Sequence, residues 1–267
     1  ETPVKKIKME DGKAVGVSAV TKDNEEIEAR AKAVIICTGG FGDNPKMIQK
    51  ETGFEFEKTI YNFAVPGMKG DGLQMAWDAG AGKTKSIMEL MYQLPDNMNH
   101  FYIEGAFRQP CLWVNRNGER FMPEDQIGNT TFTGKAIAVQ PGKIAYANFD
   151  SKRLKRWKKH GPDIVSHIHP EDLYEGFDEQ WESDLEAGYE PICQADTLEE
   201  LAEKAGIDVE GFMNQIEEYN NECEAGVDEV FEKERHYMVP VEKGPFYCCK
   251  QYCGAYGSLG GILINHK

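Results

Sequence analysis

The chain has 267 residues, of which 40% are hydrophobic and 28% are charged, and its formal net charge is −15. This length allows one large domain or two smaller ones, and the composition is typical of a folded globular protein. The strong negative charge opposes binding to nucleic acid or to an anionic membrane surface. No apolar run approaches the roughly 20 residues that cross a bilayer, so no transmembrane segment is expected.

The first 31 residues contain segments in which apolar and polar side chains alternate, at 3–9, 14–21 and 26–31. Asp11-Gly12 and Asp23-Asn24 stand at the breaks, and these residue types favour tight turns. The pattern predicts an antiparallel meander of three short strands.

Residues 33–44, AVIICTGGFGDN, follow the meander. The uninterrupted apolar run at 34–37 is typical of a strand buried on both faces, and residues 38–40 end it in a glycine turn. Asn44 before Pro45 predicts the start of a helix. Such a strand, turn and helix start exposes backbone donors for a phosphate or a polar cofactor edge, although the same join occurs where two elements simply pack closely.

A second glycine-rich turn, GMKGDG at residues 67–72, precedes apolar residues at helical spacing that end near Gly80. Asp71 either caps this second helix or accepts hydrogen bonds from ribose hydroxyls, and capping is the favoured interpretation. A glycine pair also stands near the end of the chain, where Gly260 and Gly261 precede an apolar segment at 262–264 that predicts a strand. Glycine beside a strand allows a ligand to approach the backbone closely.

Between these regions the chain mixes helices, short strands and long loops. Asn117-Gly118 predicts a hairpin turn between the segments 112–116 and 119–122. Thr197 and Asp208 each predict the N-cap of a helix. The basic run at 152–160 is predicted to be the solvated face of a helix.

Seven cysteines are an odd number, so a complete set of disulfides within the chain is excluded. Cys248, Cys249 and Cys253 lie close together, but their spacing is not that of a recognised metal-ligand set. His167 and His169 lack a partner motif and indicate an exposed loop. We expect no metal site.

Six segments in order carry a resemblance to a known family: AVIICTGGFGDN, GMKGDGLQMAWDAGA, LWVNRNGERFMPED, ADTLEELAEKAGID, GPFY and GSLGGILIN. Together they resemble the fumarate reductase/succinate dehydrogenase flavoprotein family, and in particular its soluble flavocytochrome, urocanate and 3-ketosteroid members. The resemblance implies an α/β and α+β fold, with a partial Rossmann-like FAD-binding domain that contains the meander and an inserted α+β capping domain. It assigns residues 1–85 to the FAD-binding domain, 86–239 to the capping domain and 240–267 to a return to the FAD-binding domain.

Two parts that the family carries are not found in this sequence. One is the opening strand–GxGxxG–helix that holds the ADP end of FAD, and the other is a closing segment with a substrate-binding arginine. The chain also opens on Glu1 and is strand-like by Val4. We therefore expect a piece of a longer FAD-dependent protein, which alone would bind FAD poorly or not at all.

The family chemistry is hydride transfer between flavin N5 and one carbon of an activated C–C bond, with a proton moving at the neighbouring carbon. In fumarate reductases the proton comes from an arginine in the cap through a glutamate and a second arginine. Here Arg120, Phe121 and Glu124 match the RF-x-x-E element that precedes this arginine. We expect Arg120 to anchor the cap hairpin rather than to touch substrate.

The resemblance also shows departures from the fumarate reductases. Glu104 stands at the relay glutamate, while Phe107 occupies the relay arginine position with Arg108 beside it. Gly128 stands at the position of the catalytic arginine. Tyr256 stands at one position of the histidine pair that the reductases carry before the final Gly-Gly. This loss of cationic groups makes fumarate itself a poor candidate substrate.

The resemblance assigns roles to the residues of these motifs. Tyr256 is predicted to donate a proton or hydrogen bond to a developing enolate, or else it is a packing aromatic. Glu104 and Arg108 are predicted to take part in catalysis, or else they form an ordinary surface pair. The predicted cofactor-binding residues are Thr38, Gly39, Gly40, Phe41, Gly42, Asn44, Gly70, Asp71 and Gly72, and the predicted substrate-binding residues are Ser258, Gly260 and Gly261.

These assignments predict an FAD-dependent oxidoreductase that acts on CH–CH bonds and reduces an activated alkene, in an anaerobic respiratory setting. The substrate is expected to be a small unsaturated acid or ketone, and the electrons to come from a haem or FMN domain or protein outside this chain. Dehydrogenation of a ketosteroid-like ring and a non-catalytic role in the flavoprotein are the alternatives.

Overall fold

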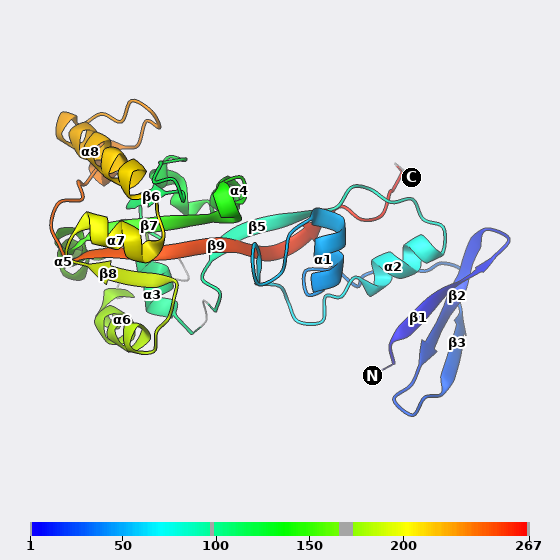
Figure 1. Cartoon of the computed structure of the whole chain (residues 1–267). Coiled ribbons are helices and arrows are strands. Elements are labelled where there is room, and N and C mark those ends of the chain that lie inside the picture. Colours follow the sequence, from blue (N-terminus) through cyan, green and yellow to red (C-terminus); the bar gives the residue numbers. More distant parts are fainter. Residues whose placement is uncertain (1, 97–98, 166–172, 266–267) are drawn as a thin grey trace. The chain divides into compact units, whose positions relative to one another are not determined.

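The computed structural model describes residues 2–96, 99–165 and 173–265, so His167 and His169 lie outside the described residues. The chain divides into two compact units (Figure 1). The first unit comprises Glu1–Phe56, Asn62–Glu89 and Ala255–Lys267, and the second comprises Glu57–Tyr61 and Leu90–Gly254.

A three-stranded antiparallel sheet opens the first unit, in the order β1 (Val4–Glu10), β2 (Lys13–Val20) and β3 (Glu26–Arg30). Its turns use residues in the left-handed region, with φ of 48° at Asp11 and 62° at Asn24. Asp and Asn tolerate this conformation better than most residues, which is why the turns occur at these positions. The predicted meander is confirmed.

The segment 33–37 is not a strand. No strand pairs with it in the part of the chain that the structure describes, and the side chain of Ile35 is 85% exposed. A strand buried on both faces requires hydrogen-bonded neighbours and covering layers, and an apolar run alone does not supply them. The predicted buried strand is therefore wrong for this structure.

The two helices of the first unit begin at the predicted turns. In α1 (Pro45–Thr52) the Asn44 side chain accepts a hydrogen bond from the Met47 N–H at 3.1 Å, which confirms the predicted cap. In α2 (Asp71–Asp78) the N-cap is Gly70, with φ of 83°, and no side chain caps the helix. The predicted capping role of Asp71 is wrong because Asp71 is itself the first helical residue.

A six-stranded sheet is built around the longest strand, β9, which is drawn in red in Figure 1. The order is β4-β9-β7-β6, and β5 and β8 also pair with β9. All seven residues of β7 are buried, so this strand lies in the centre of the second unit. The strands are β4 (Tyr61–Asn62), β5 (Ile87–Gln93), β6 (Leu112–Val114), β7 (Ile144–Asp150), β8 (Ile192–Ala195) and β9 (Phe246–Leu259).

Helices cover this sheet in the second unit, and their starts follow the predicted caps. Thr197 Oγ1 accepts from the Glu200 N–H at 3.2 Å, and Asp208 Oδ2 accepts from the Gly211 N–H at 2.8 Å. The helix predicted over the basic run is also confirmed, with Trp157 buried. The α-helices are α3 (Phe101–Phe107), α4 (Thr130–Ala138), α5 (Ser151–His160), α6 (Phe177–Glu186), α7 (Leu198–Ala205) and α8 (Val209–Ala225); short 3-10 helices span Glu124–Gly128, Pro141–Lys143, Leu173–Glu175 and Arg235–Tyr237.

Two further strand predictions are only partly correct. The Asn117-Gly118 turn forms, with φ of 81° at Gly118, but the second arm is reduced to a single bridge between Val114 and Arg120. At the end of the chain Ile262 makes one bridge to Lys83, and the predicted strand does not continue, since Ile264 is 83% exposed.

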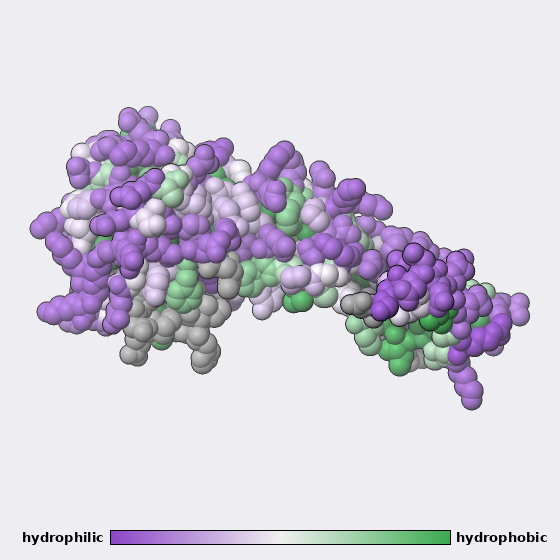
Figure 2. Space-filling view, turned by 90° about the horizontal axis from the view of Figure 1, so that it is seen from below, coloured by the Kyte–Doolittle hydropathy of each residue, from purple (hydrophilic) through white to green (hydrophobic). Residues whose placement is uncertain are grey.

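Hydrophilic residues cover most of the face seen in Figure 2, as the composition leads one to expect. Among residues 2–96, 99–165 and 173–265, every helix falls short of the length and apolarity that crossing a membrane requires.

Candidate functional site

The first glycine turn contacts the end of β9 within the first unit. The Phe41 N–H donates a hydrogen bond to Ser258 Oγ at 3.1 Å. Gly40 lies so close to this side chain that a Cβ atom at residue 40 would be 1.9 Å from Ser258 Oγ. Any larger residue at position 40 would therefore displace the serine.

The second glycine turn and the terminal glycine pair join the same group of segments. A Cβ atom at Gly72 would lie 2.0 Å from Thr38 Oγ1 in the first turn. Farther along α2, Trp77 Nε1 donates to the Gly261 carbonyl at 3.1 Å. A Cβ atom at Gly260 would lie 2.4 Å from the Lys85 carbonyl oxygen. The structure thus brings together the three glycine motifs that the sequence singled out.

Several predicted cofactor residues are engaged within the fold. Asn44 caps α1, and its Nδ2 also donates to the Lys69 carbonyl at 2.7 Å. Gly42 is buried, and a Cβ atom there would lie 2.8 Å from Ala64 Cβ. A Cβ atom at Gly70 would lie 2.6 Å from Met47 Sδ. These glycines are therefore required for close packing of the chain on itself, as the simpler interpretation of the sequence allowed.

The first turn nevertheless retains free donors. In the described part of the chain, the backbone N–H groups of Thr38, Gly39 and Gly40 make no hydrogen bond, and Thr38 and Gly39 are exposed. Consecutive free N–H groups at a glycine turn suit the acceptor atoms of a phosphate or of a flavin ring. Thr38, Gly39 and Gly40 therefore fit an FAD cofactor. Asp71 is exposed in the first turn of α2, and no contact in the described part of the chain indicates a ligand for it.

Tyr256 lies on β9, two residues before Ser258, and its side chain is 55% exposed. Its ring stacks on that of Phe63, with the ring centroids 5.6 Å apart and an interplanar angle of 16°. Sequence reasoning missed Phe63, because no motif surrounds it and its partner lies at the other end of the chain. Only the observation that Asn62 favours a local turn could have drawn attention to this segment.

Glu104 and Arg108 form a pair inside the second unit. Arg108 Nε donates to Glu104 Oε1 at 2.7 Å, and Glu104 Oε2 accepts from the Leu94 N–H at 3.0 Å. Arg108 also donates to the Tyr92 carbonyl at 2.8 Å, and its guanidinium lies 4.5 Å from the centre of the Tyr92 ring. Since Glu104 is only 2% exposed, the alternative of an ordinary surface pair is wrong.

The electrostatics of this pair favour the charged form of Arg108. Burial disfavours the charged guanidinium, but Glu104 and Tyr92 together outweigh this effect and raise the pKa of Arg108. Among the residues that the structure describes, every polar contact of the pair is made within the second unit. A role of Glu104 and Arg108 in proton supply stays a prediction.

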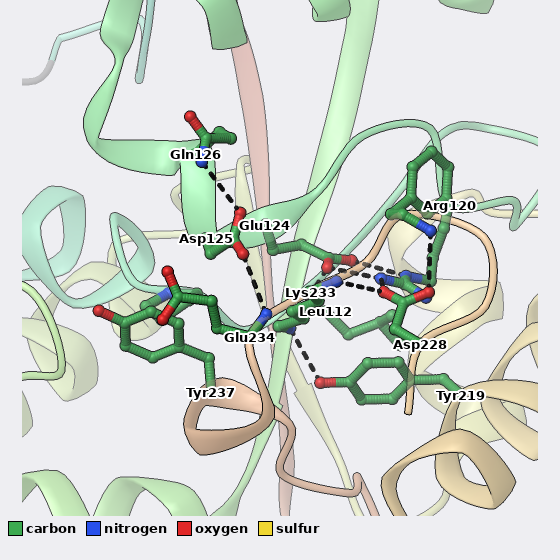
Figure 3. A network of polar contacts seen from close by, with 12 residues as sticks. Leu112, Arg120, Glu124, Asp125, Gln126, Tyr219, Asp228, Lys233, Glu234 and Tyr237 are labelled. Carbon is green, nitrogen blue, oxygen red and sulfur yellow. Dashed lines mark hydrogen bonds and ion pairs between the residues drawn. The ribbon is translucent and has the colours of Figure 1, made fainter. Parts of the chain in front are cut away.

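A buried charged cluster surrounds the RF-x-x-E element and consists of Arg120, Glu124, Asp228 and Lys233 (Figure 3). Arg120 donates to both carboxylate oxygens of Glu124, at 2.9 and 2.8 Å, and to Asp228 at 2.6 Å. Lys233 Nζ lies 3.3 Å from Glu124 and donates to the Tyr219 hydroxyl at 2.9 Å. The guanidinium joins the hairpin to the loop after α8, which confirms that Arg120 has an anchoring role.

Acidification should weaken this cluster. Burial favours the neutral acid at Asp228, but the hydrogen bonds from Arg120 and from backbone N–H groups outweigh it and hold the pKa below the ordinary 3.8. The unfolded chain therefore takes up the proton first, so this stabilisation is present above about pH 4 and is lost as the pH falls through the folded pKa. We expect the melting temperature to fall between about pH 5 and about pH 3.

The variant Asp228→Asn provides the comparison for this prediction. It should melt at a lower temperature than the parent at neutral pH, and its melting temperature should fall less on acidification. Thermal unfolding followed by circular dichroism across this pH range measures both quantities. Parallel pH curves for the two proteins would show that Asp228 does not carry the effect.

A protein-family profile described as FAD binding domain matches residues 1–267. The chain belongs to the FAD binding domain family. The family and fold class expected from the motifs are thereby confirmed, as is the expected membership of a family of FAD-dependent oxidoreductases.

Curated relatives extend this result. This FAD binding domain chain is 30% identical over 269 residues to the vinyl phenol reductase of Lactiplantibacillus plantarum, with 96% of the chain and 54% of the relative covered. It is 28% identical over 272 residues to the NADH:acrylate oxidoreductase of Vibrio harveyi, with 100% of the chain and 25% of the relative covered. The chain thus spans between a quarter and about half the length of these relatives.

Among solved structures, the 3-ketosteroid delta1-dehydrogenase from Sterolibacterium denitrificans superimposes with a TM-score of 0.73 at 22% identity, over 99% of this chain and 49% of that one. At this identity the similarity establishes the fold. The chain therefore has the same architecture as an enzyme whose structure was solved with a steroid ligand.

Proposed function

We propose that this chain belongs to an FAD-dependent oxidoreductase that reduces an activated alkene, an unsaturated acid or ketone. In this proposal the first unit is part of the FAD-binding domain and the second unit is the capping domain. The observation that carries it is the meeting of three glycine motifs in one unit, beside the free N–H groups of Thr38, Gly39 and Gly40. The family profile and the names of the two curated relatives support it.

When bound and reduced by its electron-transfer partner, the FAD cofactor would supply the hydride for reduction of the C–C double bond. The free N–H groups of the first turn would hold acceptor atoms of the cofactor. Ser258 Oγ accepts a hydrogen bond from Phe41, so its own hydrogen is available for a substrate oxygen. Tyr256 presents an exposed phenol on the same strand and donates a proton or hydrogen bond as negative charge develops on the substrate.

Replacement of Tyr256 by phenylalanine tests this assignment in the complete flavin-loaded protein. The substitution keeps the ring and removes the donor, so we expect the rate at which an alkene reoxidises reduced flavin to fall about 100-fold. Tyr102→Phe, at another exposed tyrosine, is the matched control and should keep the parental rate. An undiminished rate in Tyr256→Phe would show that Tyr256 is not the donor.

Dehydrogenation of a ketosteroid-like ring is the second candidate. The replacement of two expected arginines by Phe107 and Gly128 favours it, because such a substrate needs no cationic receptor for a carboxylate. A panel of alkenes and saturated ketones, scored by flavin reoxidation and flavin reduction, separates the two directions. In either direction we propose a haem or FMN electron-transfer partner outside this chain. A complete protein that purified without flavin would favour a non-catalytic role.

A further inference from the structure

A pair of stacked aromatic rings, the exposed Tyr256 and the half-buried Phe63, lies beside the candidate site, and Phe63 belongs to no motif in the sequence. The rings of Phe63 and Tyr256 are nearly parallel, at 16°, with their centroids 5.6 Å apart. Isolated apolar residues on a surface are common, but here Phe63 supports the ring of Tyr256, which keeps an exposed apolar surface. Both residues belong to the first unit, as the first glycine turn does.

Both rings are held in place by the backbone. Asn62 Oδ1 accepts a hydrogen bond from the Ala64 N–H at 2.8 Å, a local turn that fixes the backbone at Phe63. Ala64 in turn packs against Gly42. Tyr256 is fixed by its place in β9. A pair of rings held in this way loses little conformational entropy when it receives a ligand.

The strand period places Tyr256 on the side of the first glycine turn. Side chains two residues apart point to the same face of a strand, so Tyr256 and Ser258 share one face of β9. Ser258 accepts the hydrogen bond from Phe41 in the first turn. The aromatic rings, the serine hydroxyl and the free N–H groups of the turn therefore adjoin one another.

Two lysines of the first unit that could attract a small dicarboxylate are already paired with carboxylates. Lys69 is paired with Asp43 at 2.8 Å, and Lys83 is paired with Glu51 at 2.6 Å. A ligand that gains its binding energy from ring stacking fits these surroundings better than one that needs two cationic partners.

We propose that Phe63 and Tyr256 form an aromatic platform for the substrate, which is an alkene conjugated to an aromatic ring. This inference rests on the proposed function, and it names the substrate class of that same site. Phe63 acts as a specificity residue that positions the ring, whereas Tyr256 contributes both its ring and its hydroxyl. The reducible bond then lies next to the Ser258 and Tyr256 hydroxyls.

Two matched enones test the platform in the complete flavin-loaded protein. Benzylideneacetone and 3-penten-2-one carry the same activated double bond and differ in a phenyl or a methyl group at its end. We expect kcat/KM to favour the phenyl compound by about tenfold, because only that compound stacks. Phe63→Leu should remove the preference for the phenyl compound, Phe63→Tyr should retain it, and Val65→Ala, on the same loop, should leave it unchanged.

The outcomes separate this inference from the proposed function. Equal kcat/KM values for the two enones, or an unchanged ratio in Phe63→Leu, would overturn the platform while leaving alkene reduction intact. If neither enone reoxidises reduced flavin, proposed enone reduction fails, and binding of the saturated ketone 4-phenylbutan-2-one decides the platform by calorimetry. Binding that is lost in Phe63→Leu supports the platform, and no binding to the parent protein overturns it.

Discussion

Arg120→Ala is expected to lower the free energy of unfolding by about 3–5 kcal/mol, because it leaves buried carboxylates without their main partner. Glu124 and the side chain of Asp228 are fully buried, and both accept hydrogen bonds from this guanidinium. Lys233 still neutralises part of this charge at 3.3 Å from Glu124, so the loss should not exceed the upper value. Denaturant unfolding of the complete protein measures it.

An exposed pair in the first unit supplies the control for this measurement. Arg30 and Glu10 are 2.7 Å apart, with side chains 70% and 47% exposed, so Arg30→Ala should cost less than about 1 kcal/mol. Arg120→Lys keeps the charge but loses the bidentate contact with Glu124. Its loss of unfolding free energy should therefore lie between those of Arg120→Ala and Arg30→Ala. A loss for Arg120→Ala no larger than that for Arg30→Ala would mean that the charged cluster does not stabilise the fold.

Arg108→Met is expected to be similarly damaging, with a loss of about 3–5 kcal/mol, because Glu104 would be left as a buried and uncompensated charge. The double variant Arg108→Met/Glu104→Gln removes both charges and should recover part of this loss. Unfolding of the two single variants and the double variant completes a thermodynamic cycle. Simple addition of the two single losses would contradict a direct coupling of the pair.

The same variants decide whether the pair supplies protons. If Glu104 and Arg108 take part in proton delivery, the folded double variant should reduce alkenes at least about 10-fold more slowly, with an altered pH profile. If the pair is only structural, the double variant should keep the parental rate and pH profile at temperatures where it is folded. The rate of flavin reoxidation by an alkene across pH separates these two results.

Local interactions made the secondary structure largely predictable. The meander turns, the Asn44, Thr197 and Asp208 caps and the helix over the basic run each depend on residues within four positions of one another. The apolar run at 34–37 failed as a predictor because a strand exists only with partner strands. Asp71 failed because a left-handed residue at Gly70 moved the helix start by one position.

The candidate site likewise has a part that the sequence could predict and a part that it could not. The resemblance to a family indicated that the glycine motifs belong together, and nothing in their spacing could have shown it. The stacking of Phe63 on Tyr256, and the contacts of Arg120 with Asp228, join residues that are far apart in the chain. Such contacts follow from the way the strands and helices assemble, and no local pattern encodes them.

The position of β9 has a consequence for the order in which the protein is made. β9 is the last of the strands that the structure describes, yet β4, β5, β7 and β8 all pair with it. On the ribosome these strands emerge before their common partner, so the sheet can close only after residues 246–259 have been synthesised. Pairing between strands that are far apart in the sequence is slow. Until β9 is available, the unpaired edges of the other strands can associate with those of neighbouring molecules. Premature termination upstream of Phe246 should therefore yield an aggregating product rather than a smaller folded one.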